Sequence, residues 1–225
     1  MSNIVYKNKN IIVFNKPAGI PSQQDTTGDV HAMTLASGEL RLNSEREELY
    51  LVHRLDRVVG GLLVFARNKA TAATLSALAA EEKLGKEYLA VVSGALTDGS
   101  FTDSLYKNSI LGKAFVSDKN KNGAKRAELD YSVLDTVRTD KGEYSLVRII
   151  LKTGRFHQIR AQFSSRGHAL VGDTKYGGVD GRAMGPSLFA YKLNFSAQGE
   201  TVSVRVLPNT SEYPLNLFAP EKYEV

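Results

Sequence analysis

The sequence of 225 residues contains no cysteine. This absence excludes disulfide bonds, thiolate zinc sites and cysteine nucleophiles, and it fits a reducing compartment, so we expect a cytoplasmic protein. The sequence also lacks any run of about 18 apolar residues, the length that a membrane-spanning helix needs. Residues 1–7 lack the apolar stretch of a secretory signal. The sequence therefore predicts a protein that has no membrane partner.

Acidic residues are in the minority. The chain has 29 Lys and Arg against 24 Asp and Glu, which gives a net charge of +5 and a pI of about 9.3. Hydrophobic residues make up 42% and charged residues 24%, so the chain can bury a sizeable core as an ordinary globular protein. Many basic proteins bind no polyanion, so the net charge by itself only suggests one.

The positive charge is concentrated in two windows. Residues 113–126 contain five basic residues against Asp118, and residues 152–175 contain five against Asp173. Each window is therefore +4, and the rest of the chain is −3. Such clustering is typical of a protein that binds a phosphate backbone. A solvated hairpin tip at residues 118–123 explains the first window equally well.

The hydrophobic pattern predicts more strands than helices. Strands are expected at residues 11–14, 61–66, 88–92, 127–137, 143–152, 188–195 and 201–206. Helices are expected from Asn68, which can cap one, to about residue 83, and from about residue 157 to 165. The strands are mostly consecutive, which favours an α+β fold with a mixed or mostly antiparallel sheet. Because no linker divides the chain, we expect one domain over residues 1–225.

The first segment that suggests chemistry is residues 53–57, His-Arg-Leu-Asp-Arg, which lie between two apolar stretches. The flanking arginines keep Asp56 ionised, because a nearby positive charge lowers the pKa of an acid. The glycines at residues 60–61 permit close approach of another backbone or of a ligand. An ordinary surface ion-pair cluster is the alternative interpretation. A metal site at His53 and Asp56 is rejected, since no further cluster of ligands accompanies them.

Two more segments stand out further along the chain. Residues 86–94 read Lys-Glu-Tyr-Leu-Ala-Val-Val-Ser-Gly, a strand whose Tyr88 would by itself be a core residue. Residues 153–160 read Thr-Gly-Arg-Phe-His-Gln-Ile-Arg, and residues 172–177 read Gly-Asp-Thr-Lys-Tyr-Gly. A strand followed by a glycine and a helix start favours an anionic ligand, although the last segment is not a P-loop.

Together with Lys-Pro-Ala-Gly at residues 16–19, these segments, in this order, resemble the RluA-type pseudouridine synthases from about residue 4 to 195. The resemblance implies the α+β pseudouridine synthase fold as a single catalytic domain. It also implies an isomerase that converts uridine in ribosomal or transfer RNA to pseudouridine, with no metal and no organic cofactor. Many relatives carry an RNA-binding domain ahead of the catalytic one. We expect this chain to be a short member without that domain, and a monomer.

The resemblance also assigns roles to individual residues. Asp56 corresponds to the catalytic carboxylate, which acts either as a base or as a nucleophile. Tyr88 corresponds to the aromatic residue that stacks on the extruded base, and Arg160 to the cation that pairs with the catalytic carboxylate. Arg54 and Arg57 are expected to contact the phosphates around the flipped nucleotide or to fill the vacated stack, and Arg155 and His157 to contact the RNA backbone. From the basic window 113–126, Lys125 and Arg126 are also expected to bind RNA.

Two departures from the family pattern separate this sequence from its relatives. Val59 and Gly60 replace the usual Thr-Ser, and Gln162 replaces a histidine. These changes remove two hydroxyls and an imidazole that could support the site. Activity is expected to survive them, because the three central residues are present. A catalytically weak or inactive RNA-binding protein on the same fold is the alternative. A glycoside hydrolase would need a second carboxylate that the sequence does not identify.

Overall fold

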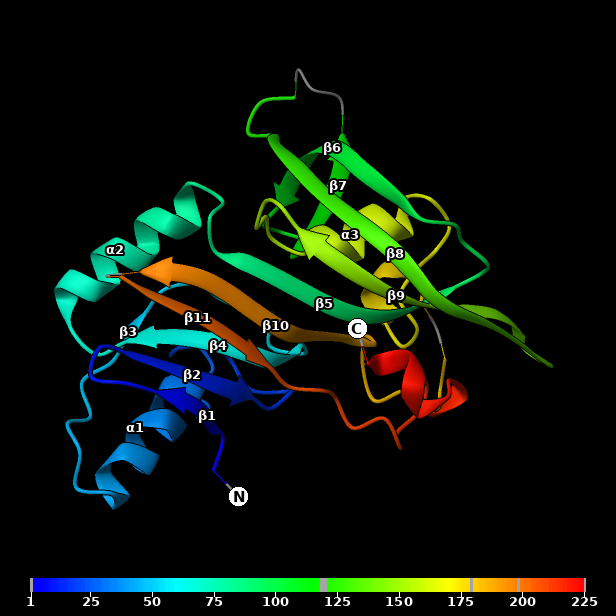
Figure 1. Ribbon diagram of the computed structural model, residues 1–225. Coiled ribbons are helices and arrows are strands. Elements are labelled where there is room, and N and C mark those ends of the chain that lie inside the picture. The colour runs from blue at the N-terminus through cyan, green and yellow to red at the C-terminus, as the bar shows by residue number, and fades with distance from the viewer. Residues whose placement is uncertain (1, 118–120, 179, 198, 225) are drawn as a thin grey trace. The chain divides into compact units, whose positions relative to one another are not determined.

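The chain forms two compact units in the computed structural model, which describes residues 2–117, 121–178, 180–197 and 199–224 (Figure 1). Unit 1 comprises Met1–Lys86 and Phe189–Pro208, and unit 2 comprises Glu87–Leu188 and Asn209–Val225. Residues 118–120 of the expected hairpin tip lie outside the described residues. No helix in the described part of the chain is both long and apolar enough to cross a membrane.

Unit 1 is a mixed sheet with two helices. Its elements are β1 (Ile4–Lys7), β2 (Ile11–Lys16), α1 (Ala32–Leu42), β3 (Tyr50–Leu51), β4 (Gly60–Ala66), α2 (Lys69–Ala80), nearly all of β10 (Leu188–Ala197) and β11 (Glu200–Arg205). The strands pair in antiparallel fashion except β4 and β10, which are parallel. The expectation of a mixed, mostly antiparallel sheet is confirmed for this unit.

Strand β4 is the centre of the unit 1 core, and all seven of its residues are buried. Its alternate residues Leu62 and Val64 pack in one cluster with Leu75 of α2. The residues that alternate with them in the strand face the opposite side of the sheet. There the rings of Phe65 and Phe14 pack edge to face, with their centroids 6.3 Å apart. Figure 1 shows α1 and α2 on opposite sides of the sheet. Both faces of β4 are therefore covered, which explains why it is apolar throughout.

Helix α2 begins as the sequence predicts. The Asn68 side chain accepts a hydrogen bond from the Thr71 amide at 2.8 Å and caps the first turn. The helix ends at Ala80, three residues before the expected end. There Glu82 adopts a left-handed conformation with φ of +61°, and the Lys83 amide donates back to the Leu78 carbonyl oxygen.

Helix α1 was not expected from the sequence. Gly38 lies in its middle, and glycine is a poor helix former. Three residues at helical spacing, Ala32, Ala36 and Leu40, are fully buried, and α1 contacts β2. The helix is therefore stabilised by packing on the sheet more than by its own residue preferences.

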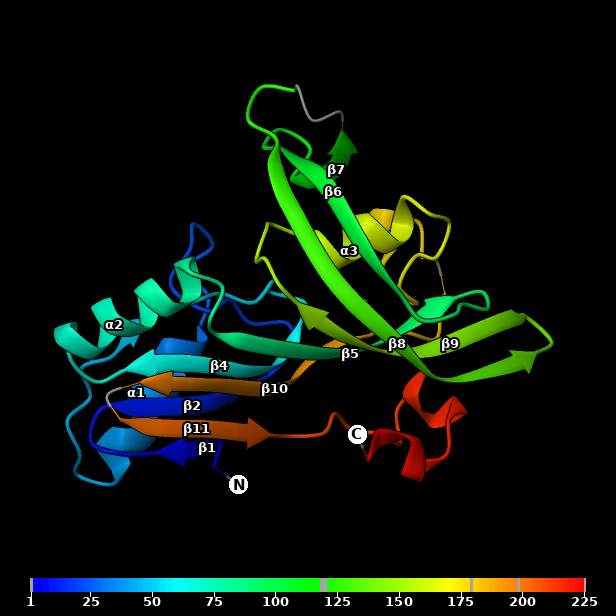
Figure 2. The same ribbon diagram turned by 45° about the horizontal axis from the view of Figure 1, so that its top comes forward.

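Unit 2 is a sheet with one α-helix, and its strand pairs β6–β7, β6–β8 and β8–β9 are antiparallel. Its elements are β5 (Gly85–Ser93), which begins in unit 1, then β6 (Gly99–Asn108), β7 (Lys113–Ser117), β8 (Lys125–Thr139), β9 (Gly142–Leu151), α3 (Gln158–Ser164) and short 3₁₀ helices at Thr174–Tyr176, Leu215–Leu217 and Pro220–Tyr223. The strand order is β5-β9-β8-β6-β7. Helix α3 packs against β6 and β7 (Figure 2).

All seven expected strands and both expected helices are present, which confirms the α+β fold class. The sequence did not reveal β6 and β7. In β6 only Phe101 and Leu105 are buried, and polar residues fill the rest of the strand. Phe101 and Tyr131 surround Phe163 of α3 with ring centroids 5.0 and 5.2 Å away. Tertiary packing therefore stabilises a strand whose own sequence lacks the usual apolar alternation.

Gly61 should not tolerate a side chain. Its φ is +113°, and a Cβ there would lie 2.3 Å from the Ala190 carbonyl oxygen of β10. We expect Gly61→Ala to lower the free energy of unfolding by roughly 1–3 kcal/mol from backbone strain alone, with a further loss from the clash. Gly38→Ala is the control, because no atom lies within 4 Å and the helix should gain about 0.5–1 kcal/mol. Urea denaturation measures both, and similar effects of the two substitutions would refute the prediction.

Candidate active site

The loop that carries Asp56 is fixed on both sides within unit 1. The Ser22 hydroxyl donates to the Leu55 carbonyl oxygen at 3.0 Å and accepts from the Leu55 amide at 3.1 Å. On the other side, the Gly19 amide donates to the Arg57 carbonyl oxygen at 2.8 Å. The segment that follows β2 therefore fixes the backbone on both sides of Asp56, through the Ser22 hydroxyl and the Gly19 amide.

A buried lysine lies beneath this loop. Lys16 is 1% exposed, and its Nζ donates to the carbonyl oxygens of Pro17 (3.0 Å), Ile20 (2.8 Å) and Arg57 (3.1 Å). Burial lowers the pKa of Lys16 to about 8, although attraction to Asp56 opposes this shift. The same attraction stabilises the Asp56 anion. The sequence analysis assigned no role to this lysine.

The two arginines beside Asp56 differ from each other. Arg57 binds Asp29 at 2.6 Å and Asp25 at 3.0 Å, and the Thr27 hydroxyl together with Arg57 lowers the pKa of Asp25 to about 2. Arg54 is exposed and forms no ion pair with any described residue. The expectation that these arginines keep Asp56 ionised stays a prediction. Two acids engage the Arg57 guanidinium, and the buried cation that attracts Asp56 within unit 1 is Lys16.

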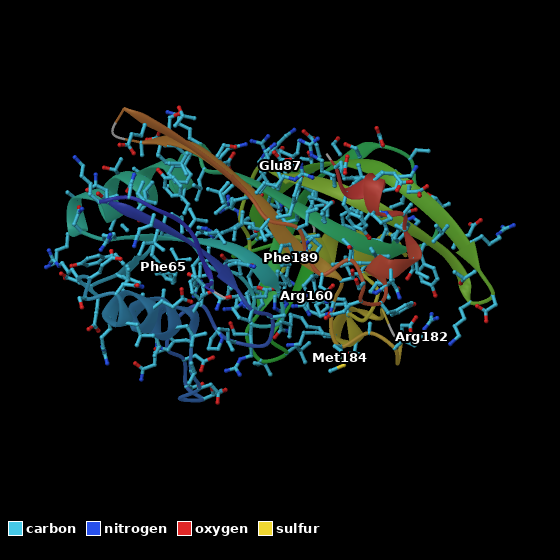
Figure 3. All side chains as sticks on the ribbon, turned by 60° about the horizontal axis from the view of Figure 1, so that its bottom comes forward. Phe65, Glu87, Arg160, Arg182, Met184 and Phe189 are labelled. Carbon is cyan, nitrogen blue, oxygen red and sulfur yellow. The ribbon has the colours of Figure 1, made fainter. Side chains whose placement is uncertain are left out.

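The residues that depart from the family pattern next to Asp56 fit their surroundings closely. Val59 is 2% exposed, and its amide donates to the Asp56 carbonyl oxygen at 3.0 Å. A Cβ on Gly60 would lie 3.3 Å from the ring of Phe189, which is labelled in Figure 3. The predicted close approach of a backbone at the glycine pair is confirmed, since β10 passes Gly61. The Phe189 ring therefore leaves little room for a side chain at residue 60.

His53 has a structural part in unit 1. Its Nε2 accepts a hydrogen bond from the Val64 amide at 3.3 Å. Burial lowers the pKa of His53 to about 3, so the imidazole is neutral at physiological pH. Among the described residues, no group of three or more His, Asp or Glu side chains is arranged to hold a metal ion.

Arg160 forms a buried, bidentate ion pair in unit 2. Its Nε and Nη2 donate to the two carboxylate oxygens of Asp173 at 2.7 and 2.8 Å, and both side chains are at most 5% exposed. Arg160 is labelled in Figure 3. Asp173 belongs to the Gly-Asp-Thr-Lys-Tyr-Gly segment, to which the sequence analysis gave no separate role. The expected pairing of Arg160 with Asp56 stays a prediction.

Tyr88 lies in β5 and is 6% exposed. The preceding residue, Glu87 (labelled in Figure 3), is also buried and binds Arg148 of β9, with 2.7 Å between Arg148 Nε and Glu87 Oε2. This ion pair ties β5 to β9 next to the tyrosine. The stacking role of Tyr88 stays a prediction.

Three of the predicted RNA-contacting residues come together in unit 2. Lys125 and Arg126 begin β8 and are exposed, and the Arg155 Nε donates to the Arg126 carbonyl oxygen at 2.8 Å. Gln158 fixes the same loop, because its side-chain oxygen accepts from the Thr153 hydroxyl and the Arg155 amide. The remaining predicted residue of this unit, His157, stacks on its neighbouring phenylalanine.

The ion pairs determine how much unpaired positive charge remains in each of the two basic windows. In the window 152–175, three of the five basic residues are paired: Lys152 with Asp130, Arg160 with Asp173 and Arg166 with Asp103. In the window 113–126, Arg126 pairs with Glu128, and it is the one paired basic residue among those described. Lys119 lies outside the described residues. More unpaired charge therefore remains in the first window, which looked the less specific of the two.

Gln162, the second departure, has polar partners inside unit 2. It is fully buried in α3, and its Nε2 donates to Asp103 at 2.7 Å and to the Ala127 carbonyl oxygen at 3.2 Å. Its Oε1 has no hydrogen-bond partner among the described residues. Asp103 also binds Arg166. In this chain Gln162 therefore helps to hold α3 on β6 and β8.

These features define an α+β protein with a carboxylate held beside a buried cation in unit 1 and a basic surface in unit 2, which suits chemistry on a nucleic acid. Residues 10–165 match the family model described as RNA pseudouridylate synthase. The chain belongs to this family, and the RluA-type resemblance is confirmed by its named relatives.

Individual relatives are similar over most of the chain. Ribosomal large subunit pseudouridine synthase D of Borreliella burgdorferi is 32% identical over 84% of this chain and 60% of its own length. tRNA pseudouridine synthase C of Haemophilus ducreyi is 32% identical over 78% of this chain and 74% of its own length. The solved structure of human RNA pseudouridylate synthase domain containing 1 has a TM-score of 0.76 at 26% identity, covering 92% of this chain and 83% of that one. The chain thus spans 60% of the length of the first relative.

Removal of the charge of Asp173 should destabilise the protein strongly. Asp173→Asn keeps the shape but deprives a buried guanidinium of its bidentate partner, so we expect the free energy of unfolding to fall by about 3–5 kcal/mol. Asp130→Asn breaks an exposed pair with Lys152 in the same unit and should cost about 0–1 kcal/mol. Urea denaturation compares the two variants, and equal losses would show that Arg160 does not depend on Asp173.

The depressed pKa of Lys16 predicts a dependence of stability on pH. Between about pH 8 and 10.5 the unfolded chain retains the Lys16 proton whereas the folded chain has lost it. The unfolded state then binds more protons, so the free energy of unfolding rises with pH in this window. Lys16→Met should lack this rise. Urea denaturation of both proteins across the window tests it, and parallel pH curves would contradict the assigned pKa.

Proposed function

We propose that the protein is an RNA pseudouridine synthase that isomerises uridine in ribosomal or transfer RNA, and that Asp56 is its catalytic carboxylate. The observation that carries the proposal is the fixed position of the Asp56 loop above the buried ammonium group of Lys16, in a chain of this family. Relatives named for the large ribosomal subunit and for tRNA support structured RNA as the substrate class.

The reaction is balanced without any co-reactant. The bond between N1 of uracil and C1′ of the ribose breaks, and a bond between C5 and C1′ forms. C5 loses a proton, and N1 gains one. Asp56 either takes up a ribose proton as a base and returns it when the new bond forms, or attacks the sugar carbon as a nucleophile when the bond to N1 breaks and leaves when C5 bonds to that carbon. Both roles need the ionised carboxylate, which the charge of Lys16 favours.

The target base must leave its stack before the glycosidic bond is accessible, at a cost of a few kcal/mol. We assign to Tyr88 the stacking contact with this base, worth roughly 1–3 kcal/mol. Arg160 orients the Asp56 carboxylate. The bond to Asp173 occupies two of the five N–H donors of Arg160 and sets the plane of its guanidinium. This planar fork suits a carboxylate better than an ammonium would.

Contacts with the RNA backbone come from the exposed cations. We assign them to Arg54, Arg57, Arg155, His157, Lys125 and Arg126. Arg54 is exposed and is open to a phosphate as it stands. Arg57 must first exchange Asp25 and Asp29 for the phosphate, so its contact forms at the expense of two hydrogen-bonded ion pairs. We therefore expect Arg54 to contribute more to RNA affinity than Arg57.

The proposal is tested by mapping pseudouridines across ribosomal and transfer RNA from the native host with the gene deleted. We expect the loss of at least one site, and its restoration when purified protein is added to RNA from the deletion strain. If no site is lost and the protein modifies none of that RNA, the protein is an inactive RNA-binding member of the family.

Asp56→Asn should reduce pseudouridine formation to background while RNA affinity stays nearly unchanged, because an amide is neither a base nor a nucleophile at this site. Product formation is measured on RNA from the deletion strain, and affinity by filter binding. Asp130→Asn, which removes an exposed carboxylate, is the control and should retain full activity. Turnover by the Asp56→Asn variant would rule out the assigned role.

A further inference from the structure

An aromatic pair lies at the start of α3 in unit 2, next to the cations already described, and consists of the exposed Phe156 and the half-buried His157. The rings of Phe156 and His157 stack with centroids 3.8 Å apart and planes 18° apart. Phe156 is 38% exposed, which is unusual for a phenylalanine beside a helix whose residues are almost all buried. Neither the packing of α3 nor the chemistry assigned to Asp56 uses this ring.

The backbone at His157 is strained in a way that orients the pair. His157 has φ of +51° and ψ of +27°, a left-handed conformation that is unfavourable for a residue with a side chain. The surrounding structure imposes it, because His157 Nδ1 lies 3.0 Å from the Tyr176 hydroxyl. That hydroxyl also accepts from the Ala114 amide at 2.7 Å. Strain of this kind is concentrated at ligand sites, so the exposed ring is a candidate for binding.

The aromatic pair is uncharged and surrounded by positive charge. Burial, helped by the charges of Arg160 and Lys175, lowers the pKa of His157 to about 3. The Lys107 Nζ lies 4.7 Å from the centre of the Phe156 ring. The cations of this surface are Lys107, Lys113, Arg155 and Lys175, and none of them forms an ion pair with a described residue. This combination of one open ring and unpaired cations complements a nucleobase and its phosphates.

We propose that Phe156, supported by His157, is a stacking platform for an unpaired nucleobase of the RNA, and that Lys107 contacts the adjoining phosphate. The proposal depends on the proposed function, since it takes RNA as the partner. The bound nucleotide is not the target uridine, for which Tyr88 is the assigned contact. Lys107 is exposed and flexible, so it can move from the ring to a phosphate when the base stacks.

The test uses Phe156→Leu, which keeps an apolar side chain but removes the ring. We expect affinity for a fluorescent oligouridylate to fall roughly 5- to 100-fold, the range that loss of one stacked base gives. Phe156→Tyr should bind like the wild type. With RNA from the deletion strain, the loss in Phe156→Leu should appear as a raised KM rather than a lowered kcat, because the ring does not touch the target uridine. An unchanged affinity of Phe156→Leu would overturn the proposal.

Phe115→Leu is the matched control. Phe115 is 41% exposed and lies on β7, which forms a hairpin with β6, the strand that carries Lys107. Within this hairpin Phe115 lies opposite Tyr106. Lys107 pairs with Ala114, so Phe115 and Lys107 are on opposite faces of the hairpin. The control should bind RNA like the wild type. If Phe115→Leu loses as much RNA affinity as Phe156→Leu, loss of any exposed aromatic ring lowers the affinity, and the stacking role of Phe156 is refuted.

Lys107→Gln gives a second, independent readout. Loss of one phosphate contact to a single strand should reduce the slope of log affinity against log salt concentration by about 0.7. An unchanged slope would refute the proposed contact between Lys107 and a phosphate.

The outcomes for the two proposals can be distinguished. A wild type that forms no pseudouridine refutes the proposed function, whereas its binding of oligouridylate still tests the role of Phe156. A wild type that does not bind oligouridylate at all refutes the platform and leaves a protein partner for this surface.

Discussion

The buried ammonium group of Lys16 is the interaction on which the Asp56 loop depends. A charged group that is 1% exposed must find acceptors inside the protein, and here three backbone carbonyl oxygens supply them. Two come from the turn after β2 and the third from Arg57, next to Asp56. The lysine thus connects strand, turn and loop through one atom. Its charge also stabilises the carboxylate that it helps to position.

Unit 2 likewise contains a buried charged group that is held by protein partners, the ion pair of Arg160 and Asp173. Both side chains are buried, and the bidentate geometry fixes the guanidinium plane as well as its position. Tyr176 follows three residues after Asp173 and orients His157, on which Phe156 stacks. The segment that holds the buried arginine therefore also presents the exposed aromatic ring. One stretch of chain serves both the proposed catalytic cation and the proposed RNA platform.

The departures from the family pattern have local explanations in the structure. Gly60 faces the ring of Phe189, and Gln162 binds Asp103 and a backbone carbonyl oxygen of β8. Each residue fits the neighbours that this chain supplies. These contacts account for Gly60 and Gln162 as parts of the fold, whereas the roles of Asp56, Tyr88 and Arg160 stay proposals.

The sequence was sufficient for the elements with strong local signals. The apolar run of β4, the Asn68 cap of α2 and the alternation of β8 and β9 follow from residue order, because burial and capping are encoded within a few neighbouring residues. The order of the family segments likewise predicted the α+β fold, which the structure confirms, whereas the catalytic role of Asp56 stays a proposal. Helix α1 and strand β6 were missed, since their stability comes from contacts with elements distant in the sequence.

The partners of the charged residues were decided only by tertiary structure. Residue order placed Arg57 beside Asp56, yet the folded chain gives Arg57 to Asp25 and Asp29 and places Lys16 beneath the loop. Spacing likewise gave no sign that Arg160 binds Asp173. Charge clustering was visible in the sequence, whereas which cations remain unpaired was not. Electrostatic attraction acts through space, so composition sets how much charge the chain carries, and the fold determines where that charge is available to a partner.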